Sequence, residues 1–185
     1  MKYYSEKAKE YIESTIHADM SQEYQMVEKY LHKRDKVLDV GFGSARDMLY
    51  FKSRGYQVEG IDSELRFVNH AKELGLIAKQ CDIKEFSTDK KYDLIWCCAS
   101  LLHLKRDEIF GVINNLTTYL SKDGILFISM KYSDQKDGED DKGRYFTYFS
   151  DKDIDLLSNV VEKNIKGDPT RENVKWVSLV MKKTE

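Results

Sequence analysis

The stretch Val37-Leu38-Asp39-Val40-Gly41-Phe42-Gly43-Ser44-Ala45-Arg46-Asp47 decides the fold class of this chain. It begins as a short apolar run of β-strand type, residues 37–40. Gly41 and Gly43 then let the backbone turn sharply and let a ligand approach without a Cβ atom in the way. From Asp47 onward the apolar residues fall at helical spacing. The stretch therefore predicts a strand, a ligand-binding loop and a helix, which is the first half of a βαβ nucleotide-binding unit.

A second predicted strand, residues 57–61, delivers Asp62 about 20 residues after the glycines, where a carboxylate accepts hydrogen bonds from a ribose. Arg46 stands where a dinucleotide site needs the third glycine of G-x-G-x-x-G, so a dinucleotide is disfavoured, although a guanidinium there would bind a carboxylate bidentately. A P-loop is excluded because G-x-x-x-x-G-K-[ST] does not occur. The first two strands thus predict a nucleotide site of another kind.

The bulk properties indicate one globular domain, residues 1–185, which begins with two helices over residues 1–33. Hydrophobic residues make up 41% and charged residues 34% of the chain, and the formal net charge is −2. No overall basic field points to nucleic acid or to an anionic membrane. The charged N-terminus lacks a signal-peptide core, and the longest apolar run, residues 94–102, is too short to cross a bilayer. We therefore expect a cytoplasmic monomer or homodimer with neither nucleic acid nor membrane as a partner.

The three cysteines, Cys81, Cys97 and Cys98, do not have the spacing of a metal site. The adjacent pair falls in a predicted buried strand, where the two side chains point to opposite faces. We interpret all three as small core residues, and no metal site is predicted.

Strands and helices alternate along the middle of the chain. Strands are expected at about 36–40, 57–61, 76–80, 92–98 and 124–130, and helices at about 45–54, 64–73 and 106–120. The strands are rich in Val, Ile and Leu with little alternation, as in a parallel sheet covered by helices on both faces. Residues 160–165 and 174–181 are expected to form a C-terminal antiparallel hairpin. The predicted fold is α/β, a doubly wound, mostly parallel seven-stranded sheet.

An acidic segment, residues 133–144, interrupts this pattern. It contains Asp134, Asp137, Glu139, Asp140 and Asp141 together with two glycines. A loop of this length is either a functional lid or a solvated connection, and the sequence leaves both open. An extended aromatic segment, residues 145–149, follows it.

Several short motifs resemble those of class I S-adenosylmethionine-dependent methyltransferases. Leu38-Asp39-Val40-Gly41-x-Gly43-Ser44-x-Arg46-Asp47 is similar to their motif I, and the likeness continues through residues 60–62, 81–83, 92–96, 98–104 and 120–126. The resemblance is strongest to the small bacterial enzymes grouped with tellurite-resistance methyltransferases. Two departures are Ala45, where relatives commonly carry glycine, and Phe42, where cysteine is frequent. The resemblance implies a Rossmann-like methyltransferase fold.

The resemblance also implies a binding site for S-adenosyl-L-methionine. Asp39 and the backbone at Gly41 and Gly43 would hold the amino-acid end, and Asp62 would accept from both ribose hydroxyls. Asp82 would meet the adenine amino group. The remaining candidates for cofactor contacts are Cys81 and Ile83 beside the adenine ring, Ala99 and Ser100 beside the sulfonium, and Tyr11, Ser44, Arg46 and Ser63.

Candidates for the acceptor side follow the fourth and fifth strands. His103 is a candidate general base, since its ordinary pKa of about 6.5 suits proton transfer, or else it packs at a helix start. Lys131 and Tyr132 follow the fifth strand, and Arg144 and Tyr145 end the acidic segment. With Arg171 and Trp176 of the terminal hairpin, these residues are implied by the resemblance to form an anion-binding, aromatic-walled pocket, or else they are solvated or pack within the hairpin. Tyr4 and Tyr11 form either a lid or an aromatic packing face.

The function expected is methyl transfer from S-adenosylmethionine to a small-molecule acceptor, with release of S-adenosylhomocysteine. Such a displacement needs alignment of the nucleophile and exclusion of water rather than a metal or a covalent nucleophile. The alternatives left open are an RNA or protein methyltransferase, a non-catalytic S-adenosylmethionine-binding regulatory module and, more distantly, a dinucleotide oxidoreductase.

Overall fold

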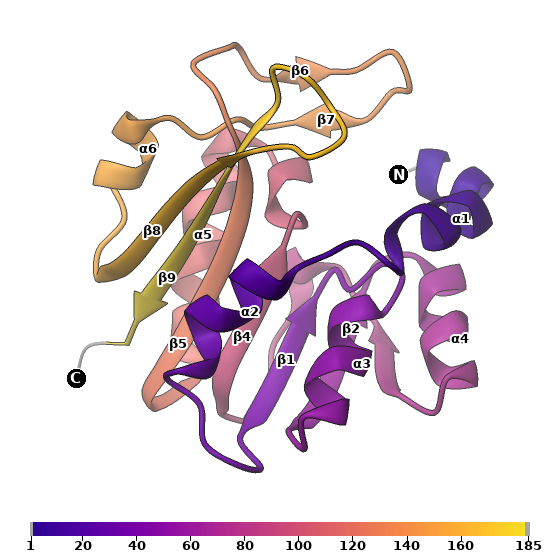
Figure 1. Ribbon diagram of the computed structural model, residues 1–185, viewed down its shortest axis with the longest axis vertical. Coiled ribbons are helices and arrows are strands. Elements are labelled where there is room, and N and C mark those ends of the chain that lie inside the picture. Colours follow the sequence, from indigo (N-terminus) through magenta and orange to yellow (C-terminus); the bar gives the residue numbers. More distant parts are fainter. Residues whose placement is uncertain (1, 184–185) are drawn as a thin grey trace.

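A seven-stranded sheet forms the centre of the molecule in the computed structural model, which describes residues 2–183 (Figure 1). Its strand order is β3-β2-β1-β4-β5-β9-β8. The strands are β1 Lys36–Val40, β2 Gln57–Asp62, β3 Ile77–Gln80, β4 Tyr92–Cys98, β5 Leu120–Tyr132, β8 Val160–Gly167 and β9 Lys175–Lys182. The helices are α1 Lys2–Thr15, α2 Ser21–Glu28, α3 Arg46–Ser53, α4 Leu65–Glu73, α5 Arg106–Thr118 and α6 Asp151–Asp155, with 3₁₀ turns η1 Ile83–Glu85 and η2 Leu101–His103.

The first five strands run parallel, whereas β9 is antiparallel to both β5 and β8. The strand β1 lies between β2 and β4, so the order of the sheet reverses beside it. Open α/β sheets bind ligands at such a reversal, outside the carboxyl ends of the strands. The predicted fold class, a mostly parallel seven-stranded sheet that ends in an antiparallel hairpin, is confirmed.

Helices cover both faces of the sheet, which explains why the central strands are apolar without alternation. Figure 1 shows α2 and α3 in front of the sheet and α5 behind it. Behind, α5 packs Ile109 and Leu116 into the cluster that contains Leu38 and Ile95. In front, Phe51 of α3 lies in the cluster that contains Trp96.

The junction between α5 and β5 differs from the prediction. The helix ends at Thr118 rather than near residue 120, and the strand begins at Leu120 rather than near 124. Leu120 is fully buried and pairs with Tyr92, because its apolar side chain is removed from water when the strand begins this early. A Cβ atom on Gly124 would lie 2.9 Å from the carbonyl oxygen of Tyr92, so only glycine fits where the strand passes this close.

The acidic segment is tied to its surroundings. Within it, β6 (Gly138–Glu139) pairs with β7 (Tyr145–Phe146) as a small antiparallel sheet. Arg106 at the start of α5 holds Asp137 through two hydrogen bonds of 2.8 Å. None of the helices within residues 2–183 combines the length and the apolar character needed to span a bilayer.

Candidate active site

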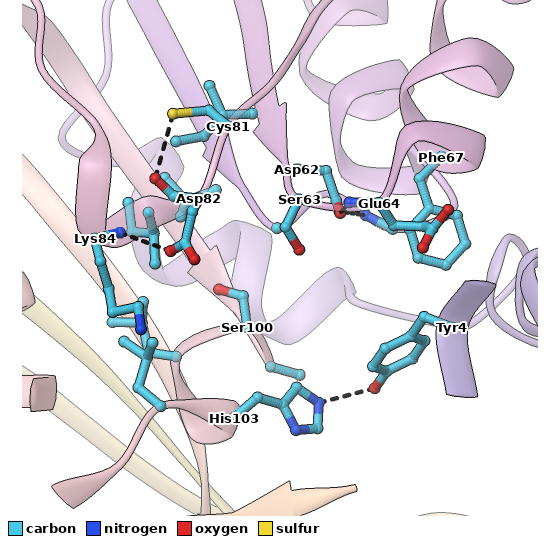
Figure 2. A pocket seen from close by; sticks show the side chains of 18 of the residues that line it. Tyr4, Asp62, Ser63, Glu64, Phe67, Cys81, Asp82, Lys84, Ser100 and His103 are labelled. Atoms are coloured by element: carbon cyan, nitrogen blue, oxygen red, sulfur yellow. Dashed lines mark hydrogen bonds between the residues drawn. The ribbon is translucent and has the colours of Figure 1, made fainter. Parts of the chain in front are cut away.

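A pocket of about 560 Å³ lies at the carboxyl ends of β1, β2, β3 and β4. Most of its lining residues come from the turns that follow these strands, as Figure 2 shows for Asp62, Asp82 and Ser100. The helix α1 adds Tyr4 and Tyr11. The predicted site residues that line the pocket are Tyr11, Gly41, Gly43, Asp62, Ser63, Cys81, Asp82, Ile83, Ala99, Ser100, His103 and Tyr145.

The loop after β1 requires glycine at two positions. Gly41 and Gly43 have φ angles of 69° and 52°, which L side chains rarely adopt. A Cβ atom on Gly41 would lie 2.5 Å from the Cβ of Ser100, and one on Gly43 would lie 2.9 Å from the ring of Tyr11. The glycines therefore bring the loop against the end of β4 and against α1.

Asp62 joins this loop to β2. Its Oδ2 accepts a hydrogen bond of 3.0 Å from the backbone N–H of Gly43, and its Oδ1 accepts one of 2.9 Å from that of Glu64. Burial raises the pKa of Asp62, because the side chain is only 8% exposed. Each oxygen retains a lone pair, so the carboxylate is able to accept from ligand hydroxyls.

Asp39 lies beneath the loop and does not line the pocket. Its side chain is 1% exposed, and its Oδ2 has no hydrogen-bond partner among the described residues. Burial raises the pKa of Asp39 well above its ordinary value, and the negative charges of Asp47 and Asp62 raise it further. A buried, unpartnered oxygen under a ligand-binding loop is an orphan acceptor that a bound cationic group would satisfy.

Arg46 does not point its guanidinium at the pocket, and Ser44 beside it is also buried away from the lining. Instead, Arg46 Nε and Nη2 donate to the two oxygens of Asp47 over 2.7 and 2.8 Å. The hydroxyl of Tyr24 and the indole N–H of Trp96 donate to the same carboxylate over 2.6 and 2.9 Å. Arg46 therefore makes its bidentate hydrogen bonds to Asp47 rather than to a ligand carboxylate.

The turn after β3 forms another wall of the pocket. The carboxylate of Asp82 is exposed and accepts a hydrogen bond of 2.9 Å from the backbone N–H of Lys84. Cys81 and Ile83 flank it in the lining. Cys81 is therefore not the core residue that the sequence indicated, whereas Cys97 is fully buried and Cys98 partly so.

The turn after β4 contributes a second unpartnered acceptor. Ala99 has a φ of 51°, and the buried Oγ of Ser100 has no hydrogen-bond partner among the described residues. Both residues line the pocket beside Gly41. A polar atom left without a partner at a pocket wall indicates a ligand contact.

His103, at the end of η2, bonds through both ring nitrogens. Its Nδ1 lies 2.8 Å from the carbonyl oxygen of Tyr145, and its Nε2 lies 2.8 Å from the hydroxyl of Tyr4. Burial lowers the pKa of His103 to about 4, and the positive charges of Arg144 and Lys131 contribute. The imidazole is therefore neutral at neutral pH and a weaker base than an ordinary histidine.

Three predicted acceptor residues, Lys131, Tyr132 and Arg144, do not line the pocket. The hydroxyl of Tyr132 donates to Asp151 over 3.0 Å on the exposed surface, because this residue turns toward α6. Lys131 places its Nζ 3.4 Å from the centroid of the Phe146 ring, and burial lowers its pKa to about 8. Arg144 donates twice to Asp140, over 2.6 and 2.9 Å.

The residues from the terminal hairpin are also engaged elsewhere. Arg171 and Trp176 both donate to Asp168, the tryptophan over 2.8 Å. The pocket instead takes in Phe67, Glu64, Lys84, Lys105, Glu108 and Glu139, none of which was among the predicted site residues. Glu64 and Lys84 each stand two residues after a predicted strand-end acid, and this spacing is a signal that would have found them.

These features fit a nucleoside that carries an amino-acid end. The loop is held open by glycine, Asp62 and Asp82 supply carboxylates at two strand ends, and Asp39 and Ser100 hold unpartnered oxygens beneath and beside the loop. The sheet order and the position of the pocket are those of the class I methyltransferase fold.

Comparison with known proteins gives the family. The family model described as "Tellurite resistance protein TehB" matches residues 1–138, and the chain belongs to this family. The "Probable S-adenosyl-L-methionine-dependent methyltransferase TehB" of Haemophilus influenzae is 27% identical over 123 residues, which cover 63% of this chain and 41% of that protein. The chain thus spans about two fifths of the length of this relative. The resemblance to this group of class I methyltransferases is confirmed.

Two solved structures show the same fold. The crystal structure of TehB from Haemophilus influenzae has a TM-score of 0.70 at 20% identity and covers 98% of this chain and 67% of its own. The 1,6-didemethyltoxoflavin-N1-methyltransferase of Burkholderia thailandensis, with bound 1,6-didemethyltoxoflavin and S-adenosylhomocysteine, has a TM-score of 0.79 at 19% identity and covers 100% of this chain and 85% of its own.

Proposed function

We propose that this chain transfers a methyl group from S-adenosylmethionine to a small-molecule acceptor and releases S-adenosylhomocysteine. The observation that carries the proposal is the convergence of four strand ends on one pocket that contains the glycine loop, Asp62, Asp82 and Ser100. Family membership and the printed names of the relatives support it.

Each strand end has a role in holding the cofactor. The backbone at Gly41 and Gly43 would face the amino-acid end, and the buried, unpartnered oxygen of Asp39 at the end of β1 would accept from its amino group. Asp62 would accept from the ribose hydroxyls, and Asp82, between Cys81 and Ile83 in the lining, would accept from the adenine amino group. When bound, the cofactor supplies an electrophilic methyl group on a sulfonium.

The remaining lining residues serve alignment and exclusion of water. The rings of Tyr4, Tyr11 and Phe67 contact one another, with centroids 5.2 to 6.0 Å apart, and close the side of the pocket next to α1. A displacement at a methyl group is accelerated mainly by holding nucleophile, carbon and leaving group in line in a dry site. These three rings supply such a wall.

A small-molecule acceptor is favoured over RNA or protein. The formal net charge is −2, and the pocket is partly closed over by α1 and the β6–β7 hairpin. The Burkholderia thailandensis structure holds a small heteroaromatic molecule beside S-adenosylhomocysteine. A net charge of −2 gives no overall positive field to attract a large polyanion such as RNA.

Calorimetric titration with S-adenosylmethionine and S-adenosylhomocysteine tests the cofactor half of the proposal. We expect Asp62→Ala to weaken binding by about 1.5–3 kcal/mol, roughly 10- to 150-fold, because hydrogen bonds to a charged group are lost. Asp89→Asn, an exposed carboxylate outside the pocket lining, is the matched control and should bind as the unmodified chain does.

Other outcomes separate the rival functions. Saturable binding of a nicotinamide dinucleotide in place of S-adenosylmethionine would reject the proposal. Tight cofactor binding without transfer to any acceptor would identify a regulatory module. Binding of bulk tRNA with a steep dependence on salt would instead favour an RNA methyltransferase.

A further inference from the structure

A short chain of hydrogen bonds with a fixed direction reaches the pocket wall. The carbonyl oxygen of Tyr145 can only accept, so His103 Nδ1, 2.8 Å away, carries the proton and donates it. The neutral imidazole then has a lone pair on Nε2. The hydroxyl of Tyr4, 2.8 Å from Nε2, is therefore the donor in the second bond.

The neighbours of this chain keep both groups neutral. Burial lowers the pKa of His103 to about 4, and Arg144 and Lys131 act in the same direction while Asp140 opposes them. Burial raises the pKa of Tyr4, with Arg144 opposing it and Tyr3 and Asp62 acting with it. Neither the imidazolium nor the phenolate forms near neutral pH, so the direction of the chain does not reverse.

The consequence is that the hydroxyl oxygen of Tyr4 turns its proton to His103. Arg144 hydrogen-bonds to the same oxygen, which leaves one lone pair for the pocket. Tyr4 and His103 both line that pocket, and Figure 2 shows their side chains pointing toward one another across it. An oxygen in this state accepts a hydrogen bond and has no donor to offer.

We propose, building on the methyltransferase function proposed above, that Tyr4 selects acceptors whose nucleophilic atom carries a hydrogen: neutral amines or hydroxyl compounds. Their N–H or O–H group donates to the Tyr4 oxygen, and this bond orients the nucleophile's own lone pair. As the new bond to the methyl carbon forms, the carbon–sulfur bond breaks and S-adenosylhomocysteine is the leaving group; the methylated product carries the positive charge and loses its proton to water on release. His103 acts as a positioning residue, because it holds the Tyr4 proton away from the substrate.

The charges around the pocket agree with a neutral acceptor. Arg144 and Arg171, two of the cations expected to bind an anion, are paired with Asp140 and Asp168 and lie outside the lining. Arg144 also hydrogen-bonds to the Tyr4 oxygen, so its guanidinium is engaged on both sides. The nearby Lys131 rests on an aromatic ring and is also outside it.

The lining itself favours the same conclusion. Its ammonium groups belong to Lys84 and Lys105, and the first of these pairs with Glu108 over 3.3 Å. Its other carboxylates include Asp62, Asp82 and Glu139. An oxyanion acceptor would be repelled by these carboxylates and would meet no donor at Tyr4.

Methyl transfer from radiolabelled S-adenosylmethionine to two groups of probes tests the proposal. One group comprises aniline, phenol and 4-aminophenol, and the other comprises tellurite and selenite. We expect transfer to amine or hydroxyl probes. Tyr4→Phe should lower kcat/KM for them about tenfold, the equivalent of one hydrogen bond, while affinity for S-adenosylhomocysteine stays within about twofold. Tyr3→Phe, on the same helix, is the control and should behave as the unmodified chain.

Three outcomes would overturn the proposal. They are methyl transfer to the oxyanions alone, equal activity of Tyr4→Phe and the unmodified chain, and binding of S-adenosylhomocysteine without transfer to any amine or hydroxyl probe. Failure to bind S-adenosylmethionine at all would instead reject the underlying methyltransferase function.

A second measurement needs no acceptor. Long-range ¹⁵N–¹H correlation spectra of histidine-labelled protein should show His103 as the neutral Nδ1–H tautomer, with an Nε2 resonance that moves in Tyr4→Phe. An Nε2–H tautomer would overturn the proposal, because Tyr4 would then accept from His103 and present its proton to the pocket.

Discussion

The buried carboxylate of Asp47 joins the start of α3, directly after the ligand-binding loop, to α2 and β4. Removing it is the sharpest test of how this loop is anchored. The side chain is 5% exposed and accepts from Arg46 twice, from Tyr24 and from Trp96, over distances of 2.6 to 2.9 Å. Asp47→Ala leaves the largely buried guanidinium of Arg46 without its counter-ion. Removing one partner of a buried ion pair costs about 3–5 kcal/mol, a large part of the roughly 5–15 kcal/mol by which an ordinary domain is stable.

A smaller change at the same carboxylate should cause a smaller loss of stability. Tyr24→Phe removes one hydroxyl from the carboxylate and should cost about 1.5–3 kcal/mol, while the stacking of its ring on Tyr50, with centroids 3.6 Å apart, is kept. In the double variant the two losses should not add, since Tyr24 loses its partner once Asp47 is gone. Asp89→Ala, an exposed carboxylate, is the control.

Urea denaturation followed by tryptophan fluorescence and circular dichroism measures these free energies of unfolding. Asp47→Ala should also lower the melting temperature by roughly 10 °C for a chain of this size. A loss of less than about 0.5 kcal/mol in Asp47→Ala, or strict additivity with Tyr24→Phe, would refute the view that this carboxylate anchors the loop.

Three further outcomes are expected. Gly60→Ala should destabilise the fold by about 1–3 kcal/mol in the same urea assay, because its Cβ would lie 2.6 Å from the Phe42 ring. Gly111→Ala, on the open face of α5, should instead stabilise the fold by about 0.5–1 kcal/mol. Equal effects of the two variants would contradict the close packing of Gly60 against Phe42. Because burial lowers the pKa of His103 to about 4, the unfolded chain binds more protons than the folded one between about pH 6.5 and 4. Acidification across that range should therefore lower the free energy of unfolding by up to about 3 kcal/mol more in the unmodified chain than in His103→Gln. Urea denaturation at a series of pH values measures this difference. Arg106→Ala should release residues 133–144 to limited proteolysis and lower methyl transfer while cofactor affinity is kept; an unchanged digestion pattern would show that other contacts hold the segment.

The fold was predictable because its signals are local. The strands β1, β2 and β4 are short apolar runs that end at a glycine, an aspartate or a cysteine pair, and their observed bounds agree with the prediction to within one residue. The same strand ends place Asp62, Asp82 and Ser100 in the pocket, because the carboxyl ends of neighbouring parallel strands meet at one edge of a sheet.

The side chains that the sequence misplaced depend on distant partners. Arg46 meets Asp47 in a network completed by Tyr24 and Trp96, which lie 23 and 49 residues from Asp47. Tyr132 is the last residue of β5, and the register of β5 with β9 decides which face each side chain takes, so a slip of one residue would reverse it. No periodicity in the local sequence reports either relationship.

The family match covers the cofactor side of the pocket more fully than the acceptor side. The match to the TehB family covers residues 1–138, which include the glycine loop, Asp62, Asp82 and Ser100. The carbonyl of Tyr145, which sets the tautomer of His103, lies beyond that range and is positioned by pairing with Glu139 in the β6–β7 sheet. The proposed methyl-donor site therefore lies within the family match, whereas the proposed choice of acceptor depends on Tyr4 and His103 within the match and on the carbonyl of Tyr145 outside it. A family named for an oxyanion does not by itself make an oxyanion the substrate here. The acceptor proposed above would meet the Tyr4 oxygen beside a neutral imidazole, in a pocket whose carboxylates outnumber the ammonium groups of Lys84 and Lys105.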